Sequence, residues 1–251
     1  MSRNKTQYYS SFEEDFFQAD KKYTLEKDYE YIKASLPHKI WASLLYEIAL
    51  IFSNIYCRLF LHVRFVGAKK VRNHKGGMFI YGNHTQPIGD VFNPALACFP
   101  KRIYTVVSPA NLHLPVIGKL LRPLGALPLP DTISGMKSFN KAIMTRVKDS
   151  HPIIIYPEAH LWEYYTKIRP FGEAAFYYPI KADMPVFCMT TTYQKRKLGK
   201  KPKITVFVDG PFIPCGNTTS EKASFLRDCV FNKMQERAKE SNCEYIKYIK
   251  K

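Results

Sequence analysis

Met78-Phe-Ile-Tyr-Gly-Asn-His-Thr-Gln-Pro-Ile-Gly-Asp90 joins an apolar run to a polar loop. The first four residues are typical of a short buried strand, and the glycines and proline that follow predict a turn. We therefore expect His84 and Asp90 in a loop at a strand end. An imidazole there accepts a proton near neutral pH, and a carboxylate at its other nitrogen would fix the tautomer. The spacing alone also fits a capped turn.

Strand-like and helix-like segments alternate on both sides of this stretch, which predicts an α/β fold with active loops beyond the strand ends. Thr218 and Glu221 form a capping box that should begin a C-terminal helix ending near Lys239. Residues 67–77 are expected to be a loop, and residues 125–130 a turn. The remaining expected strands lie within 59–66, 102–107, 151–156, 184–192 and 204–208, and the expected helices within 90–98, 115–122, 134–149 and from 169 onward.

The segment from Trp41 to Val63 is apolar and long enough to cross a bilayer as a helix. Its exceptions fall at steps of four and seven residues, which places them on one helical stripe; they are Ser43, Glu47, Asn54 and Arg58. A charged residue near the bilayer centre costs about 2.5 to 3.5 kcal/mol, so a helix lying in the interface with this stripe toward the headgroups is favoured. A buried core helix is the alternative.

Charge and cysteine content indicate the environment of the chain. Thirty-eight Lys and Arg against 21 Asp and Glu give a net charge of +17, which indicates a polyanionic partner. We expect an anionic membrane surface and no nucleic acid, because no RNP-type, zinc-finger or Gly-rich nucleic-acid motif is present; a basic nucleic-acid-binding protein stays the alternative. Six cysteines without a C-x-x-C pair are expected to be reduced, which favours a cytosolic compartment. With the basic charge and the apolar helix, this predicts a position on the cytoplasmic face of the cell membrane, with peripheral or monotopic attachment.

Four sequence blocks in residues 64 to 214 resemble the glycerolipid acyltransferase family, whose best known members acylate lysophosphatidic acid. Asn83-His84 through Asp90 is similar to the catalytic His and Asp loop of that family. The other three blocks are Gly125-Ala-Leu-Pro-Leu-Pro130, Tyr156-Pro-Glu158, and Lys167-Ile-Arg-Pro-Phe-Gly-Glu-Ala-Ala-Phe176 followed by Asp183-Met-Pro-Val186. Each block alone is a weak motif, and the four in family order are specific. The resemblance implies a mixed central sheet flanked by helices, preceded here by an N-terminal amphipathic, membrane-associating helical segment in residues 1–63. Residues 64–251 would form the acyltransferase domain.

The chain departs from the family pattern at three places. Five residues, Thr85 to Gly89, separate His84 from Asp90, where the family usually places four. Gly89 is expected to allow a bulge that restores contact between the two side chains. Ala159-His160-Leu161 follows Glu158 where Gly-Thr-Arg is common, and Pro130-Asp131 replaces a basic residue.

The resemblance implies transfer of a fatty acyl group from acyl-CoA or acyl-carrier protein to the hydroxyl of a lysophospholipid such as 1-acylglycerol-3-phosphate. His84 would be the general base, oriented by Asp90. Neither a metal nor another cofactor is expected, although a metal site made by His84, Asp90, Glu158 and His160 is a rival hypothesis. The residues expected to bind substrate are Asn83, Glu158, Lys167 and Arg169, the last two taking over the phosphate.

The residues alone also fit other roles. Glu158 could be a strand-end cap, Asn83 a turn former, and Lys167 and Arg169 solvated charges. An inactive or differently specific lipid-binding relative is the remaining alternative for the whole chain.

Overall fold

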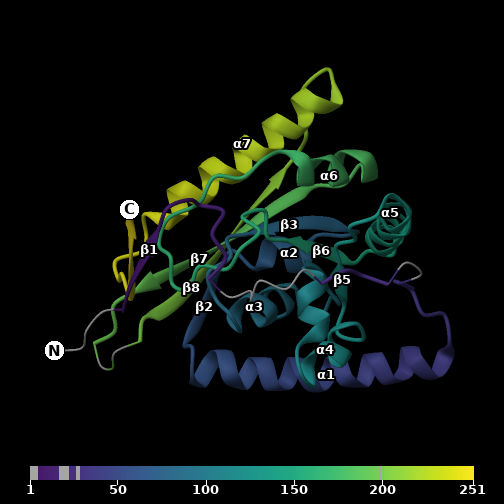
Figure 1. The fold of residues 1–251 in the computed structure, drawn as a ribbon, viewed down its shortest axis with the longest axis horizontal. Helices are drawn as coiled ribbons and strands as arrows, with labels where there is room; N and C mark the ends of the chain where they lie inside the picture. The colour runs from purple at the N-terminus through teal and green to yellow at the C-terminus, as the bar shows by residue number, and fades with distance from the viewer. Residues whose placement is uncertain (1–4, 17–22, 27–28, 198, 200) are drawn as a thin grey trace.

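The computed structural model describes residues 5–16, 23–26, 29–197, 199 and 201–251. A central sheet separates two helical layers: in Figure 1 α6 and α7 lie above it, and α1 and α3 lie below it. Helix α5 is drawn at the right-hand end of the sheet and shares one core with α7. The predicted α/β class with a mixed sheet flanked by helices is confirmed.

The main sheet has seven strands in the described residues. The pairs are parallel except β7 with β8, which run antiparallel and are joined by a basic hairpin, so the sheet is mixed. In spatial order the strands are β2 (Val63–Val66), β8 (Lys203–Phe212), β7 (Val186–Gln194), β3 (Met78–Gly82), β6 (Pro152–Ile155), β4 (Tyr104–Val107) and β5 (Ala126–Pro128).

The helices follow the order of the expected pattern. Thr218 caps α7 by accepting the Glu221 amide, and the Glu221 side chain bonds back, so the predicted capping box is confirmed. The helices are α1 (Leu36–Leu59), α2 (Lys69–Asn73), α3 (Gly89–Cys98), α4 (Ile117–Leu121), α5 (Ile133–Lys148), α6 (Tyr177–Ala182) and α7 (Thr219–Ala238), with 3₁₀ turns η1 (Pro109–His113) and η2 (Ala174–Phe176).

Strand β3 lies in the middle of the sheet and is buried along its whole length. Its side chains alternate between two cores: Phe79 and Tyr81 pack with α5 and α7, and Met78 and Ile80 pack with α1 and α3. A strand covered on both faces reads as a continuous apolar run, which is why Met78 to Tyr81 is apolar without alternation. The loop that follows Gly82 therefore leaves a rigid support.

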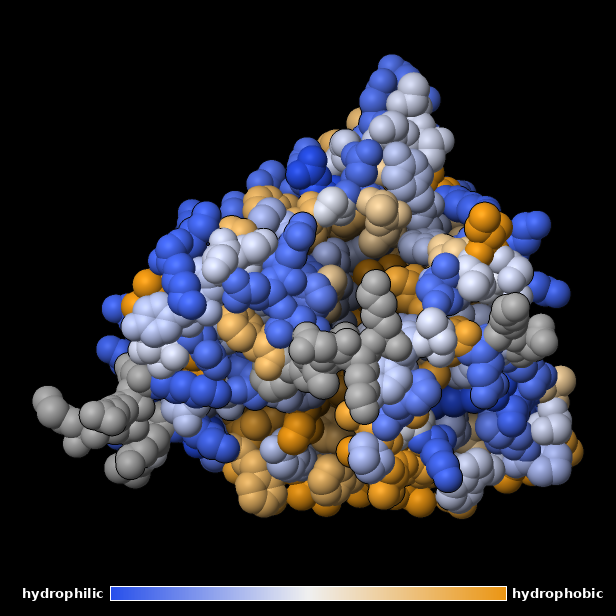
Figure 2. All heavy atoms as spheres, viewed as in Figure 1, coloured by the Kyte–Doolittle hydropathy of each residue, from blue (hydrophilic) through white to orange (hydrophobic). Residues whose placement is uncertain are grey.

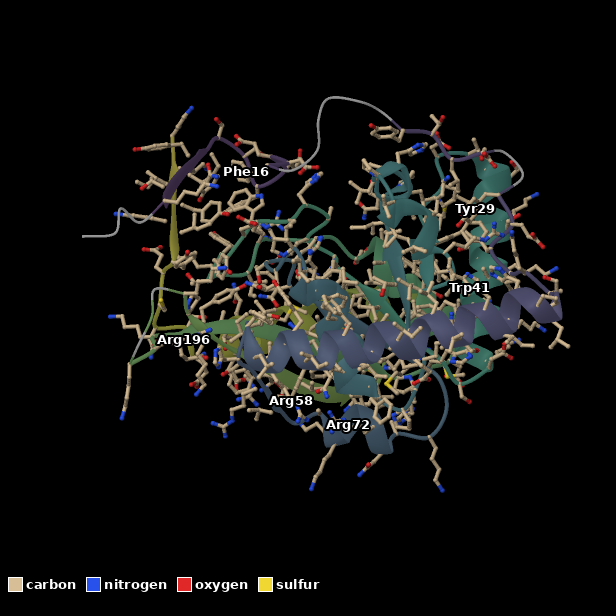
Figure 3. All side chains as sticks on the ribbon, turned by 90° about the horizontal axis from the view of Figure 1, so that it is seen from below. Phe16, Tyr29, Trp41, Arg58, Arg72 and Arg196 are labelled. Carbon is tan, nitrogen blue, oxygen red and sulfur yellow. The ribbon has the colours of Figure 1, made fainter. Side chains whose placement is uncertain are left out.

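Helix α1 presents three different faces. One face packs on the domain through Tyr46, Leu50 and Cys57, yet only 28% of the most apolar window of the helix is buried. The polar stripe is exposed beside it, and the side away from the domain exposes Ile40, Trp41, Leu44, Ile48, Ile51, Phe52, Ile55 and Leu59. Figure 2 shows hydrophobic residues along the lower edge of the molecule, where α1 runs, and Figure 3 views that face from below, with Trp41 and Arg58 toward opposite ends of the helix.

The two ends of the described chain pair with each other. Strand β1 (Lys5–Tyr9) runs parallel to β9 (Ile246–Lys250), a pairing that no local pattern predicts because its partners are separated by almost the whole chain. Rings from Tyr9, Phe12 and Phe16 then surround Trp162. Before α1, the described part of the predicted helical segment is therefore a strand and an extended arm, because its aromatic residues pack on the domain. The division of the chain at residue 63 stays a prediction.

Three other local expectations differ from the structure. Residues 67–77 contain the short helix α2, and residues 125–130 contain strand β5, which pairs with β4. The helix expected from residue 169 is replaced by a non-helical segment that contains Pro170 and Gly172, then by the 3₁₀ turn η2 from Ala174, and α6 begins only at Tyr177. A local pattern does not predict α2 or β5, because both depend on packing or pairing with segments remote in the sequence.

Candidate active site

His84 and Asp90 lie in the loop between β3 and α3, and their side chains meet. Nδ1 of His84 is 2.8 Å from Oδ2 of Asp90, and the same oxygen accepts the backbone N–H groups of Thr85 at 2.8 Å and Gln86 at 2.9 Å. Asp90 is in the first turn of α3, where the helix dipole favours a negative charge. Because a carboxylate faces Nδ1, that nitrogen carries the proton and Nε2 is left as the acceptor.

The two side chains differ in solvent access. The imidazole of His84 is 25% exposed, whereas the carboxyl side chain of Asp90 is 4% exposed. The buried carboxylate is thus held by fixed donors while the ring can be reached from outside. A general base needs both properties.

The additional residue between His84 and Asp90 does not separate them, because the loop wraps around the carboxylate. Gly89 is the first residue of α3 and has an ordinary negative φ, so it forms no left-handed bulge. A Cβ at this position would lie 2.9 Å from the Gln86 Cβ and 3.1 Å from the Asn93 Nδ2. Gly89 is therefore needed for close packing of the loop on the helix, which corrects the expectation of a bulge.

Tyr156 is a site residue whose role the sequence did not indicate beyond its place in a motif. Its ring stacks on the imidazole of His84, with centroids 4.6 Å apart and planes at 22°, and its hydroxyl donates to the Asp90 carbonyl at 2.5 Å. Burial raises the pKa of Tyr156 well above its ordinary value, and nearby Asp90 adds to the shift, so the phenol stays a donor. A Cβ on Gly82 would lie 2.6 Å from this ring.

Glu158 holds the backbone of His84. Its Oε2 accepts the His84 amide at 3.1 Å and lies 3.2 Å from Nη2 of Arg169, while its Oε1 accepts the Arg169 amide at 2.8 Å. The Trp162 amide donates to the His84 carbonyl at 3.0 Å. Burial raises the pKa of Glu158, and the Arg169 guanidinium and the two amides oppose that shift. Both backbone groups of His84 are thus fixed by the segment 158–169.

Arg169 does not face the site, which differs from the predicted phosphate contact. Its side chain is 1% exposed and lies over the ring of Trp162 at 4.9 Å. Nη1 donates to the Phe12 carbonyl at 3.3 Å, and Nη2 donates to the His160 carbonyl as well as to Glu158. Because Arg169 and Glu158 are both buried and bonded to each other, neither is placed to touch a substrate.

Asn83 and Lys167 are placed differently from that pair. The Asn83 amide is buried and bonds β7 at both ends, donating to the Thr191 carbonyl at 3.0 Å and accepting the Thr191 amide at 2.8 Å. This extends the β3–β7 pairing by one residue and starts the loop, so Asn83 is not free to bind substrate. Lys167 is exposed. Of the four residues predicted to bind substrate, Lys167 alone has a side chain that solvent reaches freely.

One polar side chain beneath the loop, that of Tyr193, had no sequence signal. The Tyr193 hydroxyl donates to Oγ1 of Thr85 at 2.7 Å and accepts from Nε2 of Gln86 at 3.1 Å. Because Tyr193 is on β7 and 108 residues beyond Thr85, only the folded sheet brings them together. Tyr193 therefore fixes Thr85 and Gln86, the two loop residues whose amides donate to Asp90.

The rival metal site is not assembled. His84 pairs with Asp90, Glu158 with Arg169, and His160 with Asp15 at 3.2 Å. Within the described residues, no group of three or more His, Cys, Asp or Glu side chains is arranged to hold a metal ion.

Comparison with known proteins agrees with the fold. The model of the family described as Acyltransferase matches residues 62–192, just over half of the chain. The 1-acyl-sn-glycerophosphate (LPA) acyltransferase PlsC from Thermotoga maritima has a similar crystal structure, with a TM-score of 0.59 at 14% identity, covering 85% of this chain and 86% of that chain. At that identity the likeness concerns the fold alone. No curated protein matches the sequence.

Proposed function

Because this chain belongs to the acyltransferase family, we propose that it moves a fatty acyl group from a thioester donor to the hydroxyl of a lysophospholipid. The donor is acyl-CoA or acyl-carrier protein, and 1-acylglycerol-3-phosphate is the expected acceptor. One observation supports the proposal above all: the 2.8 Å contact between His84 Nδ1 and a buried Asp90 oxygen that two backbone amides also hold.

In the proposed reaction, Nε2 of His84 takes the proton of the acceptor hydroxyl as its oxygen attacks the thioester carbonyl. The new C–O bond forms, the C–S bond breaks, and the proton passes from the imidazolium to the departing thiolate. Asp90 stays ionised and stabilises the imidazolium, while the Tyr156 ring limits rotation of the imidazole. No covalent acyl-enzyme is required.

Lys167 is proposed as the cation that meets the acceptor phosphate. Its ammonium is solvent-accessible, and Arg169, the other candidate, is enclosed by Glu158 and Trp162. Asn83, Glu158 and Arg169 would then act indirectly, by holding the loop that carries His84. Mutation of Lys167 should therefore weaken binding of a phosphate-bearing acceptor more than it slows turnover.

We also propose that α1 attaches the protein to the cytoplasmic face of an anionic membrane. Its exposed apolar face lies away from the domain, and the stripe with Glu47 and Arg58 runs beside it. A helix in the interface can bury its apolar face in the hydrocarbon and leave the polar stripe among the headgroups. Attachment of this kind would present the site to substrates in the same leaflet.

The test is an assay of free thiol with purified protein, acyl-CoA or acyl-carrier protein, and lysophosphatidic acid. The wild type should release thiol, and His84→Ala should lower kcat/KM by about 10³- to 10⁴-fold. His113→Ala is the matched control, because His113 is exposed on η1 and should leave turnover unchanged. Unchanged turnover in His84→Ala would refute the assignment of the base.

A panel of lysolipid and other hydroxyl acceptors, analysed by mass spectrometry, would identify the acceptor class. Lipid binding without thiol release from any donor would instead support an inactive lipid-binding relative.

A further inference from the structure

A short apolar turn between η1 and α4 exposes its side chains although its backbone is ordered by hydrogen bonds. Leu114, Val116 and Ile117 are 49%, 81% and 55% exposed. Gly118 N–H donates to the Leu114 carbonyl at 2.9 Å and Ile117 N–H to the Pro115 carbonyl at 2.6 Å. No Asp, Glu, Lys or Arg occurs between Arg102 and Lys119. The turn therefore holds three aliphatic side chains in solvent, and the nearest charged residue in sequence is Lys119.

The backbone of Val116 is unfavourable for its side chain. It has φ 63° and ψ −55°, and the bond from Ile117 to Pro115 closes around it the rare positive-φ form of the γ-turn. A β-branched residue is a clear outlier at positive φ, where glycine carries no steric penalty. Because Val116 is also 81% exposed, its side chain adds little to the core. A residue that costs stability and contributes little packing points to a function outside the fold.

The turn lies on the same side of the protein as α1. Arg102 donates to the Ala42 carbonyl in α1 at 3.2 Å and also to the Pro123 carbonyl just after α4. Figure 1 shows α4 reaching the level of α1, and Figure 2 shows hydrophobic residues along that lower edge. The exposed apolar face of α1 and the turn are thus two apolar surfaces on one side of the domain.

We propose that the turn Leu114–Ile117 is a second membrane-inserting element, which enters the same leaflet as the apolar face of α1. The proposal rests on the proposed membrane attachment. A lipid surface fits because it accepts isolated aliphatic side chains without shape complementarity, and because the next charged residue, Lys119, is an exposed cation suited to anionic headgroups. A helix alone can roll about its axis in the interface. A second point of insertion prevents that rotation and fixes the height of His84 above the bilayer.

The experiment measures partition of the full chain onto vesicles of phosphatidylcholine with phosphatidylglycerol, by sedimentation over a lipid titration. The double variant Val116→Gly, Ile117→Ser should partition about 10- to 100-fold less than the wild type, the range for withdrawing one or two aliphatic side chains from hydrocarbon. Its melting temperature should be equal or higher, because glycine relieves the strain at position 116. Ile213→Ser is the matched control: Ile213 is 62% exposed and follows β8, at the end of the sheet near the start of α7, so partition should not change.

Leu114→Ser provides a second variant on ordinary backbone, since Leu114 has φ −63° and ψ 131°. It should fold normally and lower partition several-fold. Wild-type partition in both variants would overturn the proposal. So would a wild-type dimer that the double variant converts to a monomer without loss of vesicle binding, because the turn would then contact a second copy. Wild-type protein that binds vesicles yet releases no thiol would refute the proposed reaction alone.

Discussion

Replacement of Asp90 by asparagine tests the general-base pair without removing a side chain from the core. Oδ2 of Asp90 receives three donors, from His84, Thr85 and Gln86, and the side chain is 4% exposed. If the asparagine placed its NH₂ group at the position of Oδ2, that group would face the backbone N–H groups of Thr85 and Gln86, which are also donors. The variant should therefore place its oxygen there and keep all three hydrogen bonds. The proton of the imidazole then stays on Nδ1, and only the negative charge is lost.

The expected loss of activity follows from that single change. A hydrogen bond to a charged group is worth about 1.5 to 3 kcal/mol, roughly twice a neutral one, and the imidazolium forms only as the hydroxyl proton is taken. The neutral amide keeps about half of that energy, so removing the charge should cost about 0.8 to 1.5 kcal/mol. At about 1.4 kcal/mol per factor of ten, kcat/KM should fall by roughly 4- to 12-fold. His84→Ala should lose considerably more. Because each amide keeps an acceptor, the free energy of unfolding should fall by no more than about 2 kcal/mol.

The assay is thiol release as a function of pH, with thermal unfolding measured on the same preparations. Asp131→Asn is the control, since Asp131 is an exposed residue after β5 and should behave as wild type. Activity of Asp90→Asn within twofold of wild type would refute the role of the carboxylate. A loss of activity equal to that of His84→Ala would refute the argument about the donors. It would mean that the new side-chain amide turns its NH₂ group toward His84, so that the imidazole proton moves from Nδ1 to Nε2.

Three further perturbations test the surroundings of the site. Tyr156→Phe keeps the stacked ring but removes the bond to the Asp90 carbonyl, so we expect a several-fold fall in kcat with little change in KM, whereas Tyr156→Leu should fall further; equal kcat in all three proteins would exclude a positioning role. Gly82→Ala should displace that ring, since the new Cβ would lie 2.6 Å from it, and lower the free energy of unfolding by about 1 to 3 kcal/mol in denaturant titrations; wild-type stability and turnover would contradict the close fit. Burial raises the pKa of Asp209, but hydrogen bonds from the Arg237 guanidinium to its two carboxylate oxygens, at 2.8 and 2.9 Å, and the charge of Lys70 outweigh that effect. The pKa of Asp209 therefore lies below its ordinary value near 4. The ionised carboxylate stabilises the fold above about pH 4, and this stabilisation is lost as the pH falls through the pKa of the folded state. Asp209→Asn should therefore unfold more easily at pH 7 and show a weaker acid dependence in thermal melts, and unaltered acid dependence would contradict this assignment.

The local sequence was sufficient where a pattern and its structural partner lie close together. The apolar run of β3, the helical spacing of α5 and the capping box of α7 each depend on neighbours within a few residues, and each predicted element is present. The polar stripe of α1 was also readable, because helical periodicity alone places its members on one side. These features require no knowledge of the remaining chain.

The surroundings of His84 could not be read in this way. Its backbone is held by Glu158, 74 residues further along, and its ring is covered by Tyr156, which reaches it from the end of β6 across the paired strands. The charge of Arg169 suggested a ligand, but burial under Trp162 and bonding to Glu158 make it an internal support. The type of a residue determines which hydrogen bonds and ion pairs its side chain can form. The packing around it determines which of these are formed within the protein and are therefore not available to a ligand.

The sequence by itself therefore determined the class of fold, the order of its elements and the loop that carries His84 and Asp90, since these follow from local periodicity and from motifs. Only the tertiary structure decided that the longer spacing still brings the two side chains together, that β1 joins β9, and that Leu114 to Ile117 stays exposed beside α1. The physical reason is that contact and burial are properties of segments remote in the chain, and no segment contains information on its own about what will cover it.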